Sequence, residues 1–354
     1  MSQNPQIPRR SAGTHQGLRE QLPWDLDGLR ILSLDGGGIR GILPAKILAL
    51  CEENFTGGRS AGEYFDYIAG TSTGGIIALG LSIGLPASAI LEIYLSHGAE
   101  IFPPRIQFDW KISQYAQRAW HFMRDLAVYR YDRAALTREL VNVLGNNVVG
   151  DAQRRLVVPS FDEFSEVTLF KTPHHPDYRL DWPSRMVDVA LSTSAAPTFF
   201  STYKNGDRQF ADGGVWANNP VMQALVDAMV CYQIDRHQIQ ILSLGCVESE
   251  YAFSGGQVRW GGLWHWKNII SGAMRLQSQN AIGQAGLLIG RNRLARIDLP
   301  PMKDNPIELD DFTRAAAELP ALAEEEFLKN KERLKTFFSS PRPPYKAFHG
   351  PRAS

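Results

Sequence analysis

The chain has 354 residues, of which 44% are hydrophobic and 21% are charged, and its 37 basic residues equal its 37 acidic residues. This composition is typical of a folded globular protein and excludes a disordered chain. A formal charge of zero gives no overall attraction to a nucleic acid polymer or an anionic membrane, so no nucleic acid partner is expected. An anionic partner would have to bind to a local patch of basic residues.

The first part of the chain alternates between strand and helix patterns. Residues 1–27 are polar and proline-containing, which predicts a loosely ordered arm. The apolar run Leu29–Leu34 predicts a strand, and it is followed by a glycine loop and by helical spacing over 41–53. A second strand over 64–69 leads into a tight turn at 70–75 and a helix over 76–83. Each unit is therefore a strand, a glycine turn and a helix.

The rest of the chain continues the alternation of strands and helices and ends in a charged helical segment. Strands are predicted at Val167–Lys171, 208–211 and Ile239–Leu244, and helices at 87–97, 133–144, 186–192 and 222–232. Residues 309–338 predict a charged helix interrupted at Pro320, part of a C-terminal segment (301–354) that packs on the same domain. Alternating strands and helices predict an α/β fold whose central sheet is mainly parallel and covered by helices on both faces, in three α/β/α layers.

Two stretches are less regular. Residues 103–131 mix basic and aromatic side chains, which fits either a helical insertion that acts as a lid or membrane-facing patch, or an insertion whose aromatics fill the core. Residues 252–264 predict a long loop rich in glycine and tryptophan. For Trp260, Trp264 and Trp266 we favour burial in the core over contact with a membrane.

The cysteines and the apolar stretches indicate where in the cell the protein is expected. Cys51, Cys231 and Cys246 are few and widely spaced, which indicates neither a disulfide framework nor a metal site. We find no apolar core of signal-peptide length at the N-terminus and no run of the ~20 apolar residues that span a bilayer. We expect a cytoplasmic protein that acts peripherally if its substrate is a membrane lipid.

Ser72 lies in the most informative short motif. Gly70-Thr71-Ser72-Thr73-Gly74 fits G-x-S-x-G between a predicted strand and a predicted helix, as a nucleophile elbow requires. The glycines Gly70 and Gly74 permit the sharp turn, and the helix N-terminus offers free N–H groups to a developing anion. A glycine–serine turn that merely caps a helix remains the alternative.

The glycine loop after the first strand offers a place for that anion. Gly36, Gly37 and Gly38 present successive backbone amides at a strand-to-helix turn, a pattern that binds anions and can form an oxyanion hole. Arg40 is a cation in the first helical turn, where the helix dipole disfavours it, and this indicates that it faces an anion.

The same loop also matches G-x-G-x-x-G, the dinucleotide-binding fingerprint, through Gly36, Gly38 and Gly41. That fingerprint requires an acidic residue at the tip of the second strand. The strand here ends instead at Gly70, and Asp66 lies inside it. A nucleotide-binding module is therefore the less favoured interpretation.

A serine nucleophile needs a base, and an aspartate is the best placed candidate. Asp212 follows a predicted strand and precedes Gly213 and Gly214, which allow close approach to another loop, although an ordinary Asp-Gly turn has the same sequence. None of the eight histidines lies in a motif of its own. A Ser-Asp-His triad therefore stays an alternative, but no sequence motif identifies its histidine.

Together these motifs resemble the patatin-like phospholipase family, whose pattern is G-G-G-x-R/K-G, then G-x-S-x-G, then D-G-G/A. The chain matches them in order over about residues 28–300, and it also carries the family's block at 194–200, Ser-Ala-Ala-Pro-Thr-Phe-Phe. The resemblance implies hydrolysis of fatty acyl esters by a Ser72–Asp212 dyad, with an oxyanion hole at Gly36, Gly37 and Gly38 supported by Arg40. It implies no required cofactor and no metal.

The resemblance extends to bacterial phospholipase effectors of cyclic-oligonucleotide anti-phage signalling. It implies a phospholipid membrane surface as partner, a cyclic dinucleotide as activator and the capacity to form a homo-oligomer. A constitutive lipid-turnover enzyme is the alternative, because no motif marks a nucleotide pocket.

Overall fold

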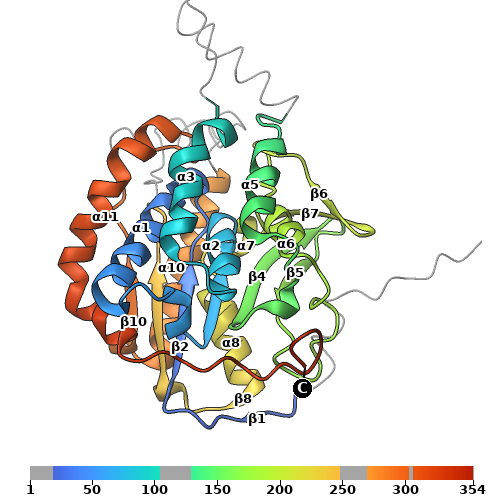
Figure 1. Cartoon of the computed structure of the whole chain (residues 1–354), viewed down its shortest axis with the longest axis vertical. Coiled ribbons are helices and arrows are strands. Elements are labelled where there is room, and N and C mark those ends of the chain that lie inside the picture. Colours follow the sequence, from blue (N-terminus) through green and yellow to red (C-terminus); the bar gives the residue numbers. More distant parts are fainter. Residues whose placement is uncertain (1–18, 104–128, 248–268, 303–305, 354) are drawn as a thin grey trace, which may run out of the picture.

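The computed structural model describes residues 19–103, 129–247, 269–302 and 306–353. Its centre is an eight-stranded sheet in the order β10-β9-β2-β3-β4-β7-β6, with β5 paired beside β4 (Figure 1). The strands of this sheet are β2 (Leu29–Leu34), β3 (Tyr67–Gly70), β4 (Arg155–Asp162), β5 (Val167–Lys171), β6 (Tyr203–Asn205), β7 (Arg208–Asp212), β9 (Ile239–Leu244) and β10 (Leu294–Ile297). A separate short pair joins β1 (Leu22–Pro23) to β8 (Tyr232–Gln233).

The sheet is mainly parallel, as the alternation of strands and helices predicts. Strands β10, β9, β2, β3 and β4 run parallel to one another, whereas β5 and β7 lie antiparallel to β4 and β6 completes a hairpin with β7. Parallel strands place their carboxyl ends along one edge of the sheet. The loops that follow β2 and β3 therefore lie side by side.

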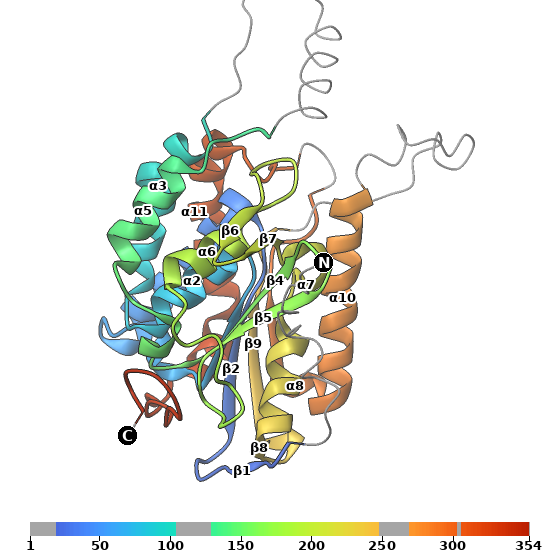
Figure 2. The same cartoon turned by 90° about the vertical axis from the view of Figure 1, so that its right-hand side faces the viewer.

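Helices cover both faces of the sheet, which confirms the three-layer α/β/α fold (Figure 2). Side chains alternate along β2, so Leu32 and Leu34 pack in one core while Leu29 and Ile31 pack in the other. The first layer holds α1 (Ile42–Cys51), α2 (Thr73–Ser82), α3 (Ala87–Ile101), α5 (Ala134–Leu144), α6 (Met186–Thr193) and α11 (Phe312–Lys335). The second holds α8 (Val221–Cys231) and α10 (Ile269–Ile289), and the short α7 (Gly214–Ala217) leads into α8.

Several elements differ from those expected. Strands β4 and β10 and helix α10 were not predicted, and the helix after Ser72 begins at Thr73 rather than at Ile76. The predicted interruption at Pro320 was wrong, because α11 continues through it. The buried residues of α11 recur at helical spacing and pack against α1, and this packing outweighs one lost backbone hydrogen bond; they include Ala315, Leu319, Ala323 and Phe327.

Some predicted features fall outside the described residues. These are residues 1–18 of the predicted arm, most of the 103–131 stretch, and the 252–264 loop with Trp260, Trp264 and Trp266. Within the described part of the chain, every helix is too short or too polar to cross a bilayer.

Candidate active site

Ser72 occupies a strained turn between β3 and α2. Its φ of 55° is unusual for a residue with a side chain, and the following helix begins directly after it. A Cβ atom on Gly70 would lie 2.0 Å from the Gly74 carbonyl oxygen, and one on Gly74 would lie 2.3 Å from the Leu34 carbonyl oxygen. Only glycine fits at these two positions, so the geometry is that of a nucleophile elbow.

Asp212 is the last residue of β7 and lies beside Ser72. Its carboxylate accepts a hydrogen bond from the Gly214 amide at 2.7 Å. Burial raises the pKa of Asp212 to about 6, although the nearby Ser72 hydroxyl and the Gly214 amide lower it. A Cβ atom on Gly213 would lie 2.3 Å from the Pro159 carbonyl oxygen, so glycine lets this loop pack against β4.

The glycine loop between β2 and α1 borders the same site. No acceptor among the described residues is recorded for the backbone N–H groups of Gly37 and Gly38, and both residues line the cavity described below. The Gly36 N–H instead donates to the Asn218 carbonyl oxygen at 3.0 Å. Gly36 therefore shapes the loop, and the expectation that it also serves as an oxyanion donor is corrected.

Arg40 holds the glycine loop in place. It is buried, and its Nε donates to the Gly37 carbonyl oxygen at 3.3 Å, which fixes the orientation of the peptide between Gly37 and Gly38. The side chain also borders the cavity. Its position therefore supports the glycine loop, as the family resemblance implies. The expectation from the helix dipole, that Arg40 faces an anion, stays a prediction.

A cavity of about 310 Å³ opens at Ser72. It is lined by Ser72, Asp212, Gly37 and Gly38 and by largely apolar side chains from both α3 and α5. Those side chains are Ile93, Tyr94, Ile101, Leu136 and Leu140. The cavity therefore joins polar reacting groups to apolar side chains suited to a hydrocarbon chain.

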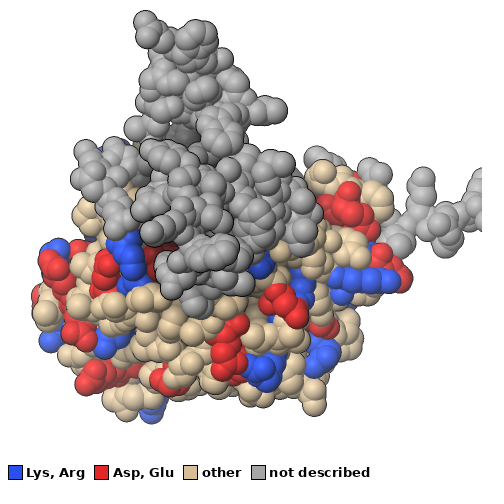
Figure 3. Space-filling model, turned by 90° about the horizontal axis from the view of Figure 1, so that it is seen from above, with Lys and Arg blue, Asp and Glu red and all other residues tan. Residues whose placement is uncertain are grey.

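Charged side chains of both signs are interspersed around the described part of the molecule seen from above (Figure 3). The visible described surface therefore shows no block of one sign, in keeping with the zero formal charge.

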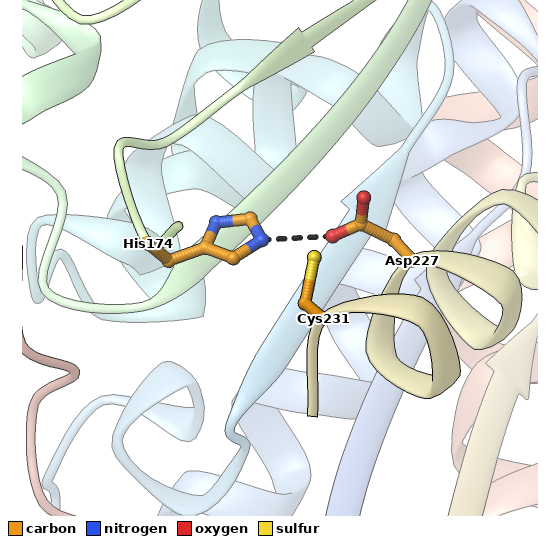
Figure 4. Close-up of side chains that lie close together, drawn as sticks. All are labelled: His174, Asp227 and Cys231. Atoms are coloured by element: carbon orange, nitrogen blue, oxygen red, sulfur yellow. Dashed lines mark hydrogen bonds and ion pairs between the residues drawn. The ribbon is translucent and has the colours of Figure 1, made fainter. Parts of the chain in front are cut away.

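No histidine lies at this cavity among the described residues. His237 is exposed in a short turn before the amino end of β9, whereas Ser72 follows the carboxyl end of the parallel strand β3, at the opposite edge of the sheet. His174 is fully buried and bonds Asp227 (Figure 4), and burial lowers the pKa of His174 to about 4. The described histidines therefore leave Asp212 as the base nearest to Ser72.

The His174 cluster also bears on metal binding. His174, Asp227 and Cys231 place their possible ligand atoms within 4.8 Å of one another (Figure 4). However, the Lys171 ammonium lies 2.6 Å from Asp227, and the Tyr178 hydroxyl contacts both Asp227 and Cys231. Burial raises the pKa of Asp227, but Lys171 and His174 lower it more, so the pKa lies below the usual range of an aspartate. Lys171 already supplies the positive charge, so the cluster gives no reason to assign a metal ion.

The dinucleotide interpretation also fails on geometry. Asp66 precedes β3 and is held by the Arg30 backbone N–H at 2.9 Å and the Arg342 guanidinium at 3.0 Å. It therefore lies at the opposite end of the strand from the glycine loop, where no ribose bound at that loop could reach it.

Comparison with known proteins agrees with this geometry. Residues 32–225 match the family model described as patatin-like phospholipase. The chain belongs to the patatin-like phospholipase family. It is similar to a protein of Escherichia coli strain TW11681 named cGAMP-activated phospholipase, with 30% identity covering 91% of this chain and 96% of that one.

Two further relatives place it within the family. A Vibrio cholerae protein also named cGAMP-activated phospholipase is 31% identical over 90% of this chain and 96% of its own length. Patatin-like protein 2 of Oryza sativa subsp. indica is 33% identical over 61% of this chain and 56% of its own length. As a patatin-like phospholipase, the chain is a hydrolase of lipid acyl esters.

The structure adds residues to the site that the motifs did not single out. Thr73 opens α2, where the first N–H groups have no acceptor within the helix, and it lines the cavity. Asn218 also lines the cavity, and its buried Oδ1 atom has no hydrogen-bond partner within the described residues. Met274 and Arg275 reach the cavity from α10.

Proposed function

We propose that Ser72 and Asp212 form a catalytic dyad that cleaves fatty acyl esters of membrane phospholipids. The observation that carries the proposal is that Ser72 and the buried carboxylate of Asp212 line the same cavity, and that burial raises the pKa of this carboxylate to about 6. An ordinary aspartate, with a pKa near ~3.9, is a weak base. A carboxylate whose pKa lies nearer to neutrality accepts the serine proton more readily and still ionises at pH 7.

The first half of the reaction acylates Ser72. Its Oγ attacks the ester carbonyl carbon while its proton passes to Asp212, and the acyl chain lies along the apolar side chains of the cavity. The amides of Gly37, Gly38 and Thr73 donate to the carbonyl oxygen as it becomes an oxyanion. Asp212 then gives its proton to the departing alcohol oxygen, and the lysophospholipid leaves.

The second half releases the fatty acid. A water molecule attacks the acyl carbonyl carbon and transfers a proton to Asp212, and the same donors hold the second oxyanion. When the bond to Ser72 breaks, Asp212 returns that proton to Oγ. One ester and one water become one alcohol and one fatty acid.

Fatty acid release from phospholipid vesicles tests this proposal. The wild-type protein should release fatty acid, and an active-site fluorophosphonate should label it once, on Ser72. Ser72→Ala should lose both signals while retaining its circular dichroism spectrum. Retention of fatty acid release by a folded Ser72→Ala variant would rule out the dyad.

We further propose that a cyclic dinucleotide activates the enzyme, which acts on the inner face of the membrane as an effector of anti-phage signalling. The support is similarity along 90% or more of the chain to two proteins named cGAMP-activated phospholipases. Titration with a panel of cyclic dinucleotides, cGAMP included, should raise the rate of fatty acid release at least tenfold with one of them. An unchanged rate across the panel would favour a constitutive lipid-turnover enzyme.

A further inference from the structure

Helices α8 and α10 form a surface without charge. They lie next to each other on the outer side of one sheet face (Figures 1 and 2). Asp227 and Arg275 are the only charged residues in their sequences, and Asp227 is buried while Arg275 borders the cavity. Within 221–231 and 272–289, where side-chain exposure is described, none of the exposed residues is charged.

Large apolar side chains protrude from this surface, which we call the α8–α10 face. Leu276 is 62% exposed and Leu287 is 79% exposed on α10, and Val226 is 49% exposed on α8. A chain with 21% charged residues would ordinarily place some of them on two adjacent exposed helices. Depletion of charge around exposed apolar side chains is typical of the centre of a protein interface.

The exposed residues of α10 form a seam with the spacing of a helix–helix contact. Ala273, Leu276, Asn280, Gly283 and Leu287 are all exposed and follow one another at steps of three and four residues. A Cβ atom built on Gly283 would meet nothing within 4 Å, so this position is open to a neighbouring helix. Small residues at such a seam let two helices approach closely.

The seam is complementary to a second copy of itself. If two α10 helices cross antiparallel about a twofold axis at Asn280, Leu287 meets Ala273 of the other copy. In the same arrangement Leu276 meets Gln284 of the other copy, next to Gly283. Leu287 therefore faces a small side chain and Leu276 packs beside a glycine, so the seam is self-complementary, as a twofold interface requires. The absence of charge also means that no like charges meet across the axis.

The size of the surface fits a stable dimer. A helix of 21 residues is about 31 Å long and about 10 Å wide, so α10 and α8 together offer a footprint of roughly 500 Å². Accessible area exceeds footprint, and each partner of a standard interface buries about 800 Å². The dimensions are therefore of the right order.

A membrane fits this face less well than a second copy does. Helix α10 begins at the cavity, where Met274 and Arg275 line it, and runs down the side of the molecule (Figure 2). A bilayer lying across the cavity mouth would meet only the first turns of α10 and would leave Leu287 in water. We propose that the α8–α10 face is the interface of a twofold homodimer, with Asn280 on the axis.

Charge insertion with sedimentation analysis of the full chain tests the dimer. Wild-type protein should sediment as a dimer at micromolar concentration, and Leu276→Asp and Leu287→Asp should each weaken dimerisation at least tenfold. Leu328→Asp is the matched control, because Leu328 is a 66% exposed leucine on α11, in the other helical layer. A wild-type monomer would overturn the proposal, and so would a dimer that survives both substitutions.

Cysteine cross-linking tests the axis independently of stability. The native cysteines Cys51, Cys231 and Cys246 are all buried, so a short bismaleimide should report only introduced thiols. Asn280→Cys should cross-link to the same residue of the other copy. Leu287→Cys should not, because two copies of a residue seven positions from the axis lie about 21 Å apart along antiparallel helices. Cross-linking at 287 but not at 280 would refute this arrangement. Monomers that lose only vesicle binding on Leu276→Asp would point to lipid as the occupant instead.

Discussion

Burial of the Asp212 carboxylate lowers the free energy of unfolding by an amount that can be measured. Its pKa is raised from 3.8 to about 6, mainly by burial, so the folded state holds a proton that the unfolded state releases near pH 4. Folding stability therefore falls as pH rises from about 4 to about 6 and then levels off. A shift of about two units at ~1.4 kcal/mol each corresponds to about 3 kcal/mol above pH 7.

Asp212→Asn removes this cost while keeping the shape of the side chain. The neutral amide can still accept a hydrogen bond from the Gly214 amide, so the fold should be preserved. We expect the variant to be inactive and yet more stable than wild type by up to about 3 kcal/mol at pH 8, with the difference vanishing near pH 4. Such a trade between stability and function is typical of an active site.

Urea unfolding of both proteins, followed by tryptophan fluorescence between pH 4 and pH 8, measures the difference. Asp207→Asn is the matched control, since Asp207 is an exposed carboxylate in the turn between β6 and β7. At pH 8 it should change the free energy of unfolding by much less than Asp212→Asn does. If the difference between Asp212→Asn and wild type stays constant with pH, or if the variant is less stable than wild type at pH 8, burial of the Asp212 carboxylate does not lower the stability of the protein.

Further outcomes follow from the same geometry. Wild-type kcat/KM should rise with pH along a curve with an apparent pKa of about 6, because only ionised Asp212 accepts the Ser72 proton; a flat pH–rate profile over pH 5–8 would contradict this. Gly37→Ala should lower kcat by roughly 10²–10³, because its Cβ would lie 2.3 Å from the Cys246 Cβ and displace the donor loop; an unchanged kcat would place the oxyanion elsewhere. Asn218→Ala should lower turnover of a p-nitrophenyl ester without unfolding the protein, since Asn218 lines the cavity and its buried amide oxygen bonds to none of the described residues. His237→Ala should leave turnover unchanged, and a folded but inactive variant would restore the triad.

The local motifs predicted much of the site because their geometry is set by short-range sterics. A serine between Gly70 and Gly74 can form an elbow only where a strand meets a helix, and the sequence shows both. Asp212 was likewise predicted from the two glycines after it. The structure adds what sequence spacing cannot contain, namely the burial that raises the pKa of Asp212.

Long-range contacts account for what the sequence did not reveal. The Gly36 amide is occupied by the carbonyl of Asn218, a contact between residues far apart in the chain. Strand β4 contains Pro159 and begins at Arg155, which made it unlike a central strand, yet Arg155 is buried and bonded to the Tyr232 hydroxyl at 2.9 Å. Helix α10 carries apolar residues around most of its circumference, so no single buried face marked it as an amphipathic helix.

Catalysis by the dyad requires that Ser72 carries the acyl group during turnover. Acid quenching of the enzyme during reaction with a slowly hydrolysed acyl ester, followed by peptide mass spectrometry, tests it most directly. We expect one acyl adduct, on the peptide that contains Ser72, and none in Ser72→Ala. Release of fatty acid without an adduct, or with an adduct on another residue, would contradict it.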